Sequence, residues 1–129
     1  MRVLVVDDDE IFCRLLAEIL EARGMEAVWT TDGLAGYEMA GRLPYDVFII
    51  DVRMPLVLGT ELAEALKKDH PCAKIILVSA FADETLLDLS ERIGVSVLSK
   101  PFSARRLLEA VESSAEPAGS NCCPDERSS

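Results

Sequence analysis

Acidic side chains are concentrated at two places where runs of apolar residues end. The sequence VLVVDDDE puts Asp7, Asp8 and Asp9 directly after one apolar run, and Asp51 follows another, VFII. Carboxylates held close together raise one another's pKa unless a cation offsets their repulsion. An all-oxygen cluster suits Mg²⁺ or Mn²⁺, and a carboxylate can also attack phosphorus as a nucleophile. These residue types therefore suggest a metal site, a phosphoryl-transfer site, or both.

A hydroxyl and an ammonium group follow two later apolar runs. Ser79 ends the run KIILVS, and Lys100 follows VSVLS. Taken singly, each polar residue has an ordinary structural explanation, and for Asp9 we prefer the capping of the helix that follows. Asp51 alone would be a turn residue, and Lys100 alone a solvated charge. Only their common position after apolar runs argues for a shared site.

The elements that must position these residues alternate regularly along the chain. Short apolar runs predict strands, and segments with apolar residues at helical spacing predict helices. The expected strands cover residues 2–6, 25–30, 45–50, 74–78 and 95–99. The expected helices cover residues 10–23, 34–43, 60–69, 83–93 and 103–112. In the first helix, the residues at helical spacing are Ile11, Leu15, Leu16, Ile19 and Leu20.

Strands that are apolar on both faces and alternate with helices indicate a parallel sheet covered on each side. The predicted fold class is therefore α/β, a doubly wound (βα)5 five-stranded parallel sheet. Ligands of such sheets bind beyond the carboxyl ends of the strands. Asp7, Asp8, Asp51, Ser79 and Lys100 all come at strand ends, so we expect them to meet at one edge.

The composition narrows the classes of partner. A chain of 129 residues fits one domain. The formal net charge of −10, from 13 basic and 23 acidic residues, argues against direct binding to nucleic acid. No apolar run is long enough to span a bilayer, and the amino terminus lacks a cleavable signal pattern. We expect a cytoplasmic protein that does not bind membranes.

The cysteines and the carboxyl-terminal segment give little functional information. The chain has four cysteines without metal-site spacing, which favours reduced thiols. Cys122 and Cys123 are adjacent in a polar segment rich in small residues. We expect residues 115–129 to form a flexible polar tail.

The motifs at the strand ends resemble those of the receiver domain of two-component response regulators. The matching stretches are VVDDDE, FIIDVRMPLVLG, ILVSA and LSKPF, in the family's order, and together they span residues 2 to about 114. The resemblance implies a single receiver domain at residues 1–114 with the flavodoxin-like, CheY-like fold. It also implies a phosphoprotein of a phosphorelay rather than a conventional enzyme, one that catalyses its own phosphorylation and dephosphorylation with Mg²⁺.

The resemblance implies roles for the site residues. Asp51 would be the phosphoacceptor, taking a phosphoryl group from the phosphohistidine of a sensor histidine kinase or a phosphotransfer protein. Asp8 would bind Mg²⁺ directly, Asp7 mostly through water, and the Arg53 backbone carbonyl would complete the protein ligands beside Asp51. Lys100 would pair with the phosphoryl oxygens.

The resemblance also implies how the signal leaves the site. Ser79 would move to hydrogen-bond the phosphoryl group, and the bond between Lys100 and Pro101 would be cis. The downstream target would be a protein, which the sequence does not identify. A homodimer through the face formed by helix 83–93, strand 95–99 and helix 103–112 is a further implied assembly.

Several positions depart from the family pattern. Val97 stands where many members carry an aromatic residue that follows the Ser/Thr movement, so output would take another route. The stretch Leu56-Val57-Leu58 replaces a more polar loop, and we favour local packing over a partner-facing patch. Arg53 and Phe81 occupy the positions that flank the path of the hydrolytic water, and their bulk predicts slow loss of phosphate.

Two alternatives remain. A haloacid-dehalogenase-like phosphatase also carries an Asp nucleophile after its first strand, and Asp7-x-Asp9 superficially fits its motif. That family needs a further acidic pair beyond the Lys, and it leaves Asp51 unexplained. The second alternative is a receiver-like interaction module that works without phosphorylation, which the presence of all five site residues disfavours.

Overall fold

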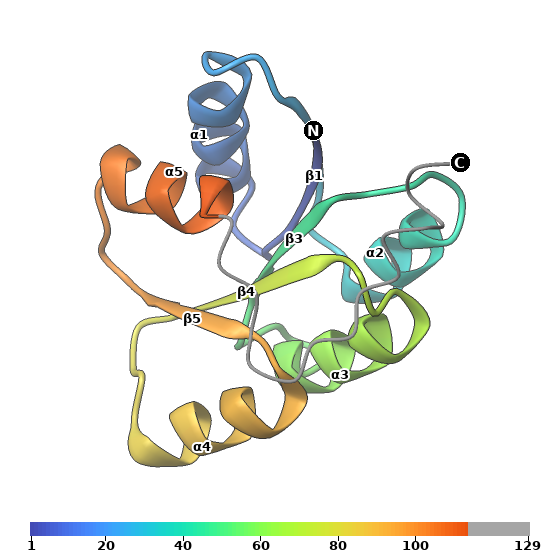
Figure 1. Cartoon of the computed structure of the whole chain (residues 1–129), viewed down its shortest axis with the longest axis vertical. Helices are drawn as coiled ribbons and strands as arrows, with labels where there is room; N and C mark the ends of the chain where they lie inside the picture. The colour runs from blue at the N-terminus through green and yellow to red at the C-terminus, as the bar shows by residue number, and fades with distance from the viewer. Residues whose placement is uncertain (114–129) are drawn as a thin grey trace.

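Each strand of this chain is followed by a helix. A computed structural model describes residues 1–113, in which five parallel strands form one sheet in the order β2-β1-β3-β4-β5 (Figure 1). The strands are β1 (Arg2–Val6), β2 (Glu26–Thr30), β3 (Val47–Asp51), β4 (Lys74–Ser79) and β5 (Ser96–Ser99). The helices are α1 (Glu10–Glu21), α2 (Gly33–Ala40), α3 (Gly59–Asp69), α4 (Glu84–Ile93) and α5 (Ala104–Glu112). The predicted doubly wound α/β fold is confirmed.

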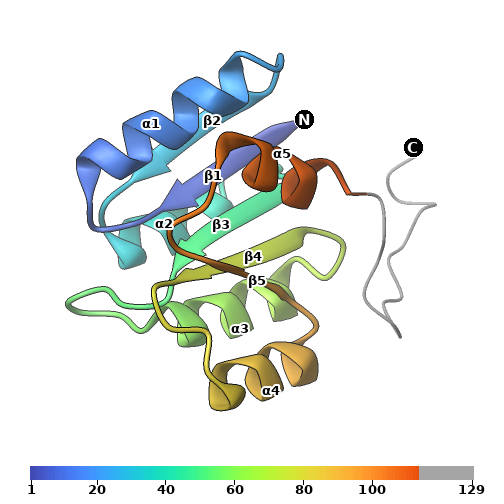
Figure 2. The same cartoon turned by 90° about the vertical axis from the view of Figure 1, so that its left-hand side faces the viewer.

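Successive side chains of the central strands point to opposite faces, and each face is covered by helices. Figure 1 and Figure 2 show α1 and α5 on one face, with α3 and α4 on the other. Val5 and Ile49 pack with the first pair of helices, whereas Val6 and Ile50 pack with the second set, which includes α2. Residues of β1 and β3 are buried on both sides because a parallel sheet with two helical layers exposes neither face.

The inner face of α1 differs from the predicted one. Ile11 and Leu15 are exposed, at 80 % and 51 %. Cys13, Leu16, Ala17 and Leu20 are the buried residues of this helix. The helix carries more apolar residues than the arc facing the sheet can hold, so part of the predicted stripe lies in solvent.

The boundaries of two elements also differ from the prediction. α2 ends at Ala40 because Gly41 caps it, three residues before the predicted end at residue 43. β3 begins at Val47 rather than at residue 45, and it includes Asp51, which pairs with Val78 of β4. The phosphoacceptor candidate therefore lies on the last residue of a central strand.

Two further predictions concern membrane spans and the carboxyl-terminal segment. Within residues 1–113 no helix is both long and apolar enough to cross a membrane. The predicted tail at 115–129, with Cys122 and Cys123, lies outside the described residues. The domain boundary at residue 114 therefore stays a prediction.

Candidate functional site

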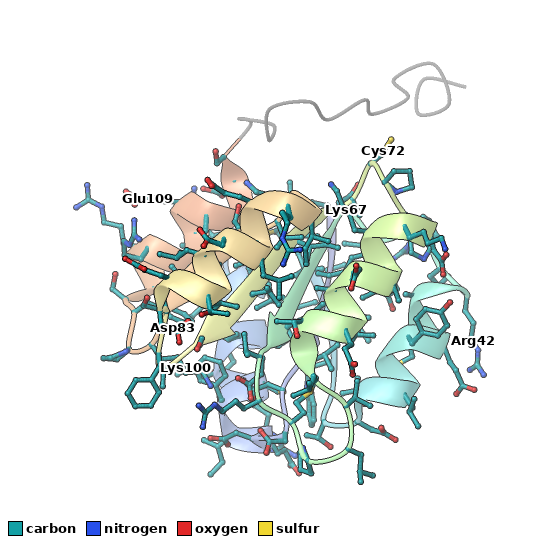
Figure 3. All side chains as sticks on the ribbon, turned by 90° about the horizontal axis from the view of Figure 1, so that it is seen from below. Arg42, Lys67, Cys72, Asp83, Lys100 and Glu109 are labelled. Atoms are coloured by element: carbon teal, nitrogen blue, oxygen red, sulfur yellow. The ribbon has the colours of Figure 1, made fainter. Side chains whose placement is uncertain are left out.

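The predicted site residues meet at the carboxyl edge of the sheet. Asp7 follows β1, while Asp51 and Ser79 end β3 and β4, and Lys100 follows β5. Figure 3 shows Lys100 at the same end of the molecule as Asp83, which precedes α4, and at the opposite end from Cys72. The parallel register explains this convergence, since Asp51 pairs with Val78 and Ser79 pairs with Ser99.

Three carboxylates form a group that could hold a metal ion. One oxygen from each of Asp7, Asp8 and Asp51 lies within 4.8 Å of the other two. Asp7 and Asp51 are buried, whereas Asp8 is exposed. Hard divalent cations such as Mg²⁺ take oxygen ligands and keep several waters. The donor set fits such an ion, with the exposed Asp8 on the side open to water.

Lys100 is the cation that balances this group among the described residues. Its Nζ lies 3.3 Å from Asp7 Oδ2 and 3.7 Å from Asp51 Oδ1. The Lys100 side chain is 28 % exposed, so it reaches the site along a partly buried path. The Lys100–Pro101 peptide bond is cis, as the resemblance implies. One ammonium shared by two buried carboxylates leaves the site with a net negative charge.

Burial and mutual repulsion raise the pKa values of the two buried carboxyl groups. Desolvation, aided by the negative charge of Asp7, raises the pKa of Asp51 to about 6, although Lys100 and the Arg53 backbone N–H act in the opposite direction. Desolvation also raises the pKa of Asp7, against hydrogen bonds from the Asp9 backbone N–H and Lys100. At neutral pH Asp51 is thus still mostly ionised, in a place where a second cation would be favourable.

The loop after Asp51 passes very close to the strand end. The Gly59 N–H donates to the Val52 carbonyl at 2.9 Å, which closes the loop just before α3. A Cβ on Gly59 would overlap the Asp51 carbonyl oxygen. Only glycine therefore allows α3 to begin this close to the phosphoacceptor candidate.

The Leu56-Val57-Leu58 stretch divides between packing and exposure. Val57 packs against the buried core and lies against Gly33 at the start of α2. Leu56 and Leu58 are exposed, at 89 % and 53 %. The predicted local packing therefore holds for Val57, and the two leucines are apolar surface beside the site.

The Ser79 hydroxyl is engaged by the loop that follows β4. Its Oγ–H donates to the Phe81 carbonyl at 2.9 Å, and the Phe81 N–H donates to Oγ at 3.0 Å. The exposed Phe81 ring has its centre 5.8 Å from the Arg53 guanidinium carbon. The two residues that are predicted to slow the loss of phosphate therefore contact each other. Val97 occupies the position where many family members carry an aromatic residue. It is partly buried and packs against the core.

Asp9 caps α1 as predicted, and its contacts reveal a residue that the sequence reasoning missed. Its Oδ1 accepts from the Phe12 N–H at 3.2 Å, while its own N–H donates to Asp7 Oδ1 at 2.9 Å. The Phe12 ring lies 4.4 Å from Lys100 Nζ. The sequence feature that could have indicated this contact is an aromatic residue, Phe12, in the first helical turn after Asp7, Asp8 and Asp9.

Comparison with protein families identifies the class of domain. The family model of the response regulator receiver domain matches residues 3–112. A response regulator receiver protein of Anaeromyxobacter sp. (strain Fw109-5) is 34 % identical over 109 residues, which are 84 % of this chain but only 46 % of that protein. The polar-differentiation response regulator DivK of Brucella ovis is 32 % identical, with 86 % of this chain and 93 % of DivK covered.

Solved structures agree with this result. A CheY-like receiver domain from Methanospirillum hungatei JF-1 has a TM-score of 0.83 and 29 % identity, with 86 % of this chain and 90 % of that chain covered. A response regulator from Burkholderia pseudomallei, with a phosphorylated aspartic acid, a calcium ion and citrate, has a TM-score of 0.81 and 25 % identity, with 87 % and 66 % covered. The chain belongs to the response regulator receiver domain family of two-component signalling.

Proposed function

We propose that Asp51 accepts a phosphoryl group from a partner phosphohistidine in a reaction that depends on Mg²⁺. The observation that carries this proposal is the buried Asp51 carboxylate at the end of β3, with Lys100 Nζ at 3.7 Å and two further carboxylates close enough to share a metal ion. The proposed donor is a sensor histidine kinase or a phosphotransfer protein.

In the proposed reaction an Asp51 oxygen attacks phosphorus and forms an O–P bond. The P–N bond to the donor histidine breaks, and the imidazole leaves with the electron pair and takes up a proton. Mg²⁺ held by Asp7, Asp8, Asp51 and the Arg53 carbonyl would offset charge on the phosphoryl oxygens. Lys100 would pair with the same oxygens, because positioning and charge neutralisation supply most of the catalysis in phosphoryl transfer.

The proposed signal begins with Ser79. To donate to a phosphoryl oxygen, its Oγ–H must leave the Phe81 carbonyl, which frees the loop before α4. Val97 has no ring to follow this movement, so the Phe81 segment itself is the proposed route to α4 and β5. The change would alter contacts with a protein target or with a second copy through the face of α4, β5 and α5.

The lifetime of the phosphorylated form is proposed to be long. Arg53 follows Asp51 by two residues, and its guanidinium carbon lies 5.8 Å from the centre of the Phe81 ring. This pair would restrict the approach of water in line with the O–P bond. The chain would thus catalyse its own phosphorylation and slow dephosphorylation without acting as a conventional enzyme.

A cytoplasmic location is part of the same proposal. Cys13 is a buried free thiol, which fits a reducing compartment. The net charge of −10 favours basic protein surfaces over nucleic acid as partners.

Incubation with Mg²⁺ and acetyl phosphate, followed by intact-mass measurement, tests the function and separates it from its rivals. A receiver gains one phosphoryl group that Asp51→Asn does not gain. A haloacid-dehalogenase-like phosphatase would instead hydrolyse the donor over many turnovers and use Asp7. A phosphorylation-independent module would do neither, and that result would refute the proposal.

A further inference from the structure

The ammonium group of Lys100 contacts more than carboxylates. On one side it faces Asp7 and Asp51, with Nζ at 3.3 Å and 3.7 Å from their nearest oxygens. Another neighbour of Nζ is the Phe12 ring, at 4.4 Å from the ring centre. A cation this close to an aromatic face is attracted to it, and the attraction is greater when water is partly excluded.

Phe12 is itself held by groups of the site. Its backbone N–H donates to Asp9 Oδ1, and the Asp9 N–H donates to Asp7 Oδ1. Asp7, Asp9, Phe12 and Lys100 therefore form a closed ring of contacts, because Lys100 returns to Asp7. The position of the aromatic ring is tied to the same carboxylate that the ammonium pairs with.

A second aromatic residue fixes the orientation of the Phe12 ring. Phe102 lies two residues after Lys100, and its ring is 5.8 Å from that of Phe12 in an edge-on arrangement, at 74° between the planes. Edge-to-face pairs of this kind are favourable beyond their buried area. The segment that carries Lys100 thus contacts Phe12 at two points, through the Lys100 ammonium and through the Phe102 ring.

We propose that Phe12 is a positioning residue that keeps the Lys100 ammonium at the phosphoacceptor site. This inference rests on the proposed function, since it assigns the ring a role in phosphoryl transfer to Asp51. The lysine stem has many rotamers, and solvent competes for its head group. The ring limits both, so that the ammonium is already beside Asp51 when the phosphoryl group arrives and no ordering is needed at that moment.

If Phe12 positions Lys100, its removal should lower the rate of phosphorylation without lowering the affinity for Mg²⁺. Without the ring, Lys100 spends less time beside Asp51, and phosphorylation slows. The ammonium also competes with Mg²⁺ for the same carboxylates, so Mg²⁺ affinity should be unchanged or higher. Damage to the local structure would weaken both properties together.

The test uses the full 129-residue chain with Phe12→Leu, which removes the aromatic face and keeps an apolar side chain, and Phe12→Tyr, which restores the face. We expect Phe12→Leu to be phosphorylated by acetyl phosphate roughly threefold to tenfold more slowly, from the size of a partly desolvated cation–π contact. Phe12→Tyr should be close to wild type. Mg²⁺ affinity, measured by calorimetry without a phosphoryl donor, should not fall in either variant.

The matched control is another aromatic–cation pair that involves α1. The Arg14 guanidinium carbon lies 5.9 Å from the centre of the Trp29 ring, and the other partner of Arg14 is Glu10, which is not a site residue. Trp29→Leu should therefore leave the phosphorylation rate unchanged. An equal loss of rate in Trp29→Leu would overturn the assignment, because it would show that any such pair on α1 matters equally.

A direct readout of the contact is available in the wild-type protein, whether or not the leucine variant folds. The Lys100 methylene protons next to the ammonium should show an upfield ring-current shift in NMR spectra, which Phe12→Tyr keeps. Absence of that shift in the wild type would overturn the proposal. So would wild-type phosphorylation of Phe12→Leu, failure of Phe12→Tyr to restore the rate, or a parallel loss of Mg²⁺ affinity.

These outcomes are distinct from a failure of the proposed function. If the wild-type chain does not accept a phosphoryl group at Asp51, the receiver function fails for this protein. If the wild type accepts it and Phe12→Leu does so equally fast, only the role of Phe12 fails.

Discussion

The two ends of the sheet carry a similar set of charges with opposite consequences. At the carboxyl end, Asp7 and Asp51 share the Lys100 ammonium. At the amino end, Glu26 and Asp46 surround Arg2, where the guanidinium pairs with Glu26 at 2.9 Å and the Arg2 backbone N–H donates to Asp46 at 2.8 Å. Both ends therefore bring carboxylates close to one basic residue.

The difference between the ends is burial. Glu26 is exposed, and its hydrogen bond and ion pair with Arg2 lower its pKa. Asp51 is 8 % exposed, and burial raises its pKa to about 6. The amino end also borders an open hollow of about 390 Å³, lined by Met1, Arg2, Gly24, Glu26, Pro44 and Asp46. Charges that are balanced in water stabilise a fold, whereas buried carboxylates with one shared cation are poised to bind another cation or react.

The largest predicted contrast follows from changing one acid to its amide at each end. Asp51→Asn should abolish phosphorylation by acetyl phosphate, because it removes the nucleophile. Glu26→Gln should leave the reaction at the wild-type rate, since the Glu26 carboxylate pairs with Arg2 at the opposite end of the sheet. Phosphate-affinity electrophoresis measures both variants, and full phosphorylation of Asp51→Asn would contradict the assignment.

Removal of the basic side chain at each end should give the next largest contrast. Lys100→Met should slow phosphorylation by roughly 100-fold to 1,000-fold, the usual cost of removing a charge-stabilising donor. Arg2→Met should not change the rate and should lower the unfolding temperature only slightly. Stopped-flow or rapid-quench kinetics at saturating Mg²⁺ provide the comparison, and equal rates in the two variants would remove the distinction.

The two ends should also contribute to stability with opposite dependence on pH. Because the folded-state pKa of Asp51 is raised from 3.8 to about 6, the folded state binds the proton more tightly. Stability of the metal-free chain should therefore fall as the pH rises through this window, by roughly 2–3 kcal/mol from Asp51. The Asp51→Asn variant should lose this decrease.

At the exposed amino end of the sheet, the dependence of stability on pH has the opposite sign. The folded-state pKa of Glu26 is lowered, so its stabilising contribution is present above its ordinary pKa and is lost as the pH falls through the lowered value. Urea unfolding between about pH 3 and about pH 7 measures both effects, with Glu26→Gln as the matched variant. A metal-free stability that rises through the Asp51 window would contradict the predicted burial penalty.

The smallest predicted effect concerns the lifetime of the phosphorylated form. Arg53→Ala and Phe81→Ala together should speed dephosphorylation about twofold to fivefold, which corresponds to the loss of one exposed cation–π contact. Decay of the phosphorylated chain after removal of the donor measures it. An unchanged decay rate would show that this pair does not restrict water.

Most of the fold and the position of the site could be predicted from local patterns. The runs that end in Asp7, Asp51 and Ser79 are short and apolar, and parallel strands bring such ends together without knowledge of distant contacts. Lys100 was predictable for the same reason. Burial of these groups follows from their place at central strand ends, which the alternation of strands and helices indicates.

The remaining features depend on contacts between distant residues. Ile11 and Leu15 share the helical periodicity of buried residues, but the sheet and α5 cover only one arc of α1. The contact between Phe12 and Lys100 joins residues far apart in the chain, and the overlap that excludes a side chain at Gly59 requires the path of the loop. Periodicity carries no information about either.

The role of Asp51 as the phosphoacceptor is tested by locating the phosphoryl group in the chain. The chain is phosphorylated with acetyl phosphate and Mg²⁺, the acyl phosphate is reduced with borohydride, and the position of the resulting homoserine is read by peptide mass mapping. We expect modification at residue 51 alone, in a reaction that stops when Mg²⁺ is chelated. Modification at Asp7 or Asp8 instead, or none at all, would contradict it.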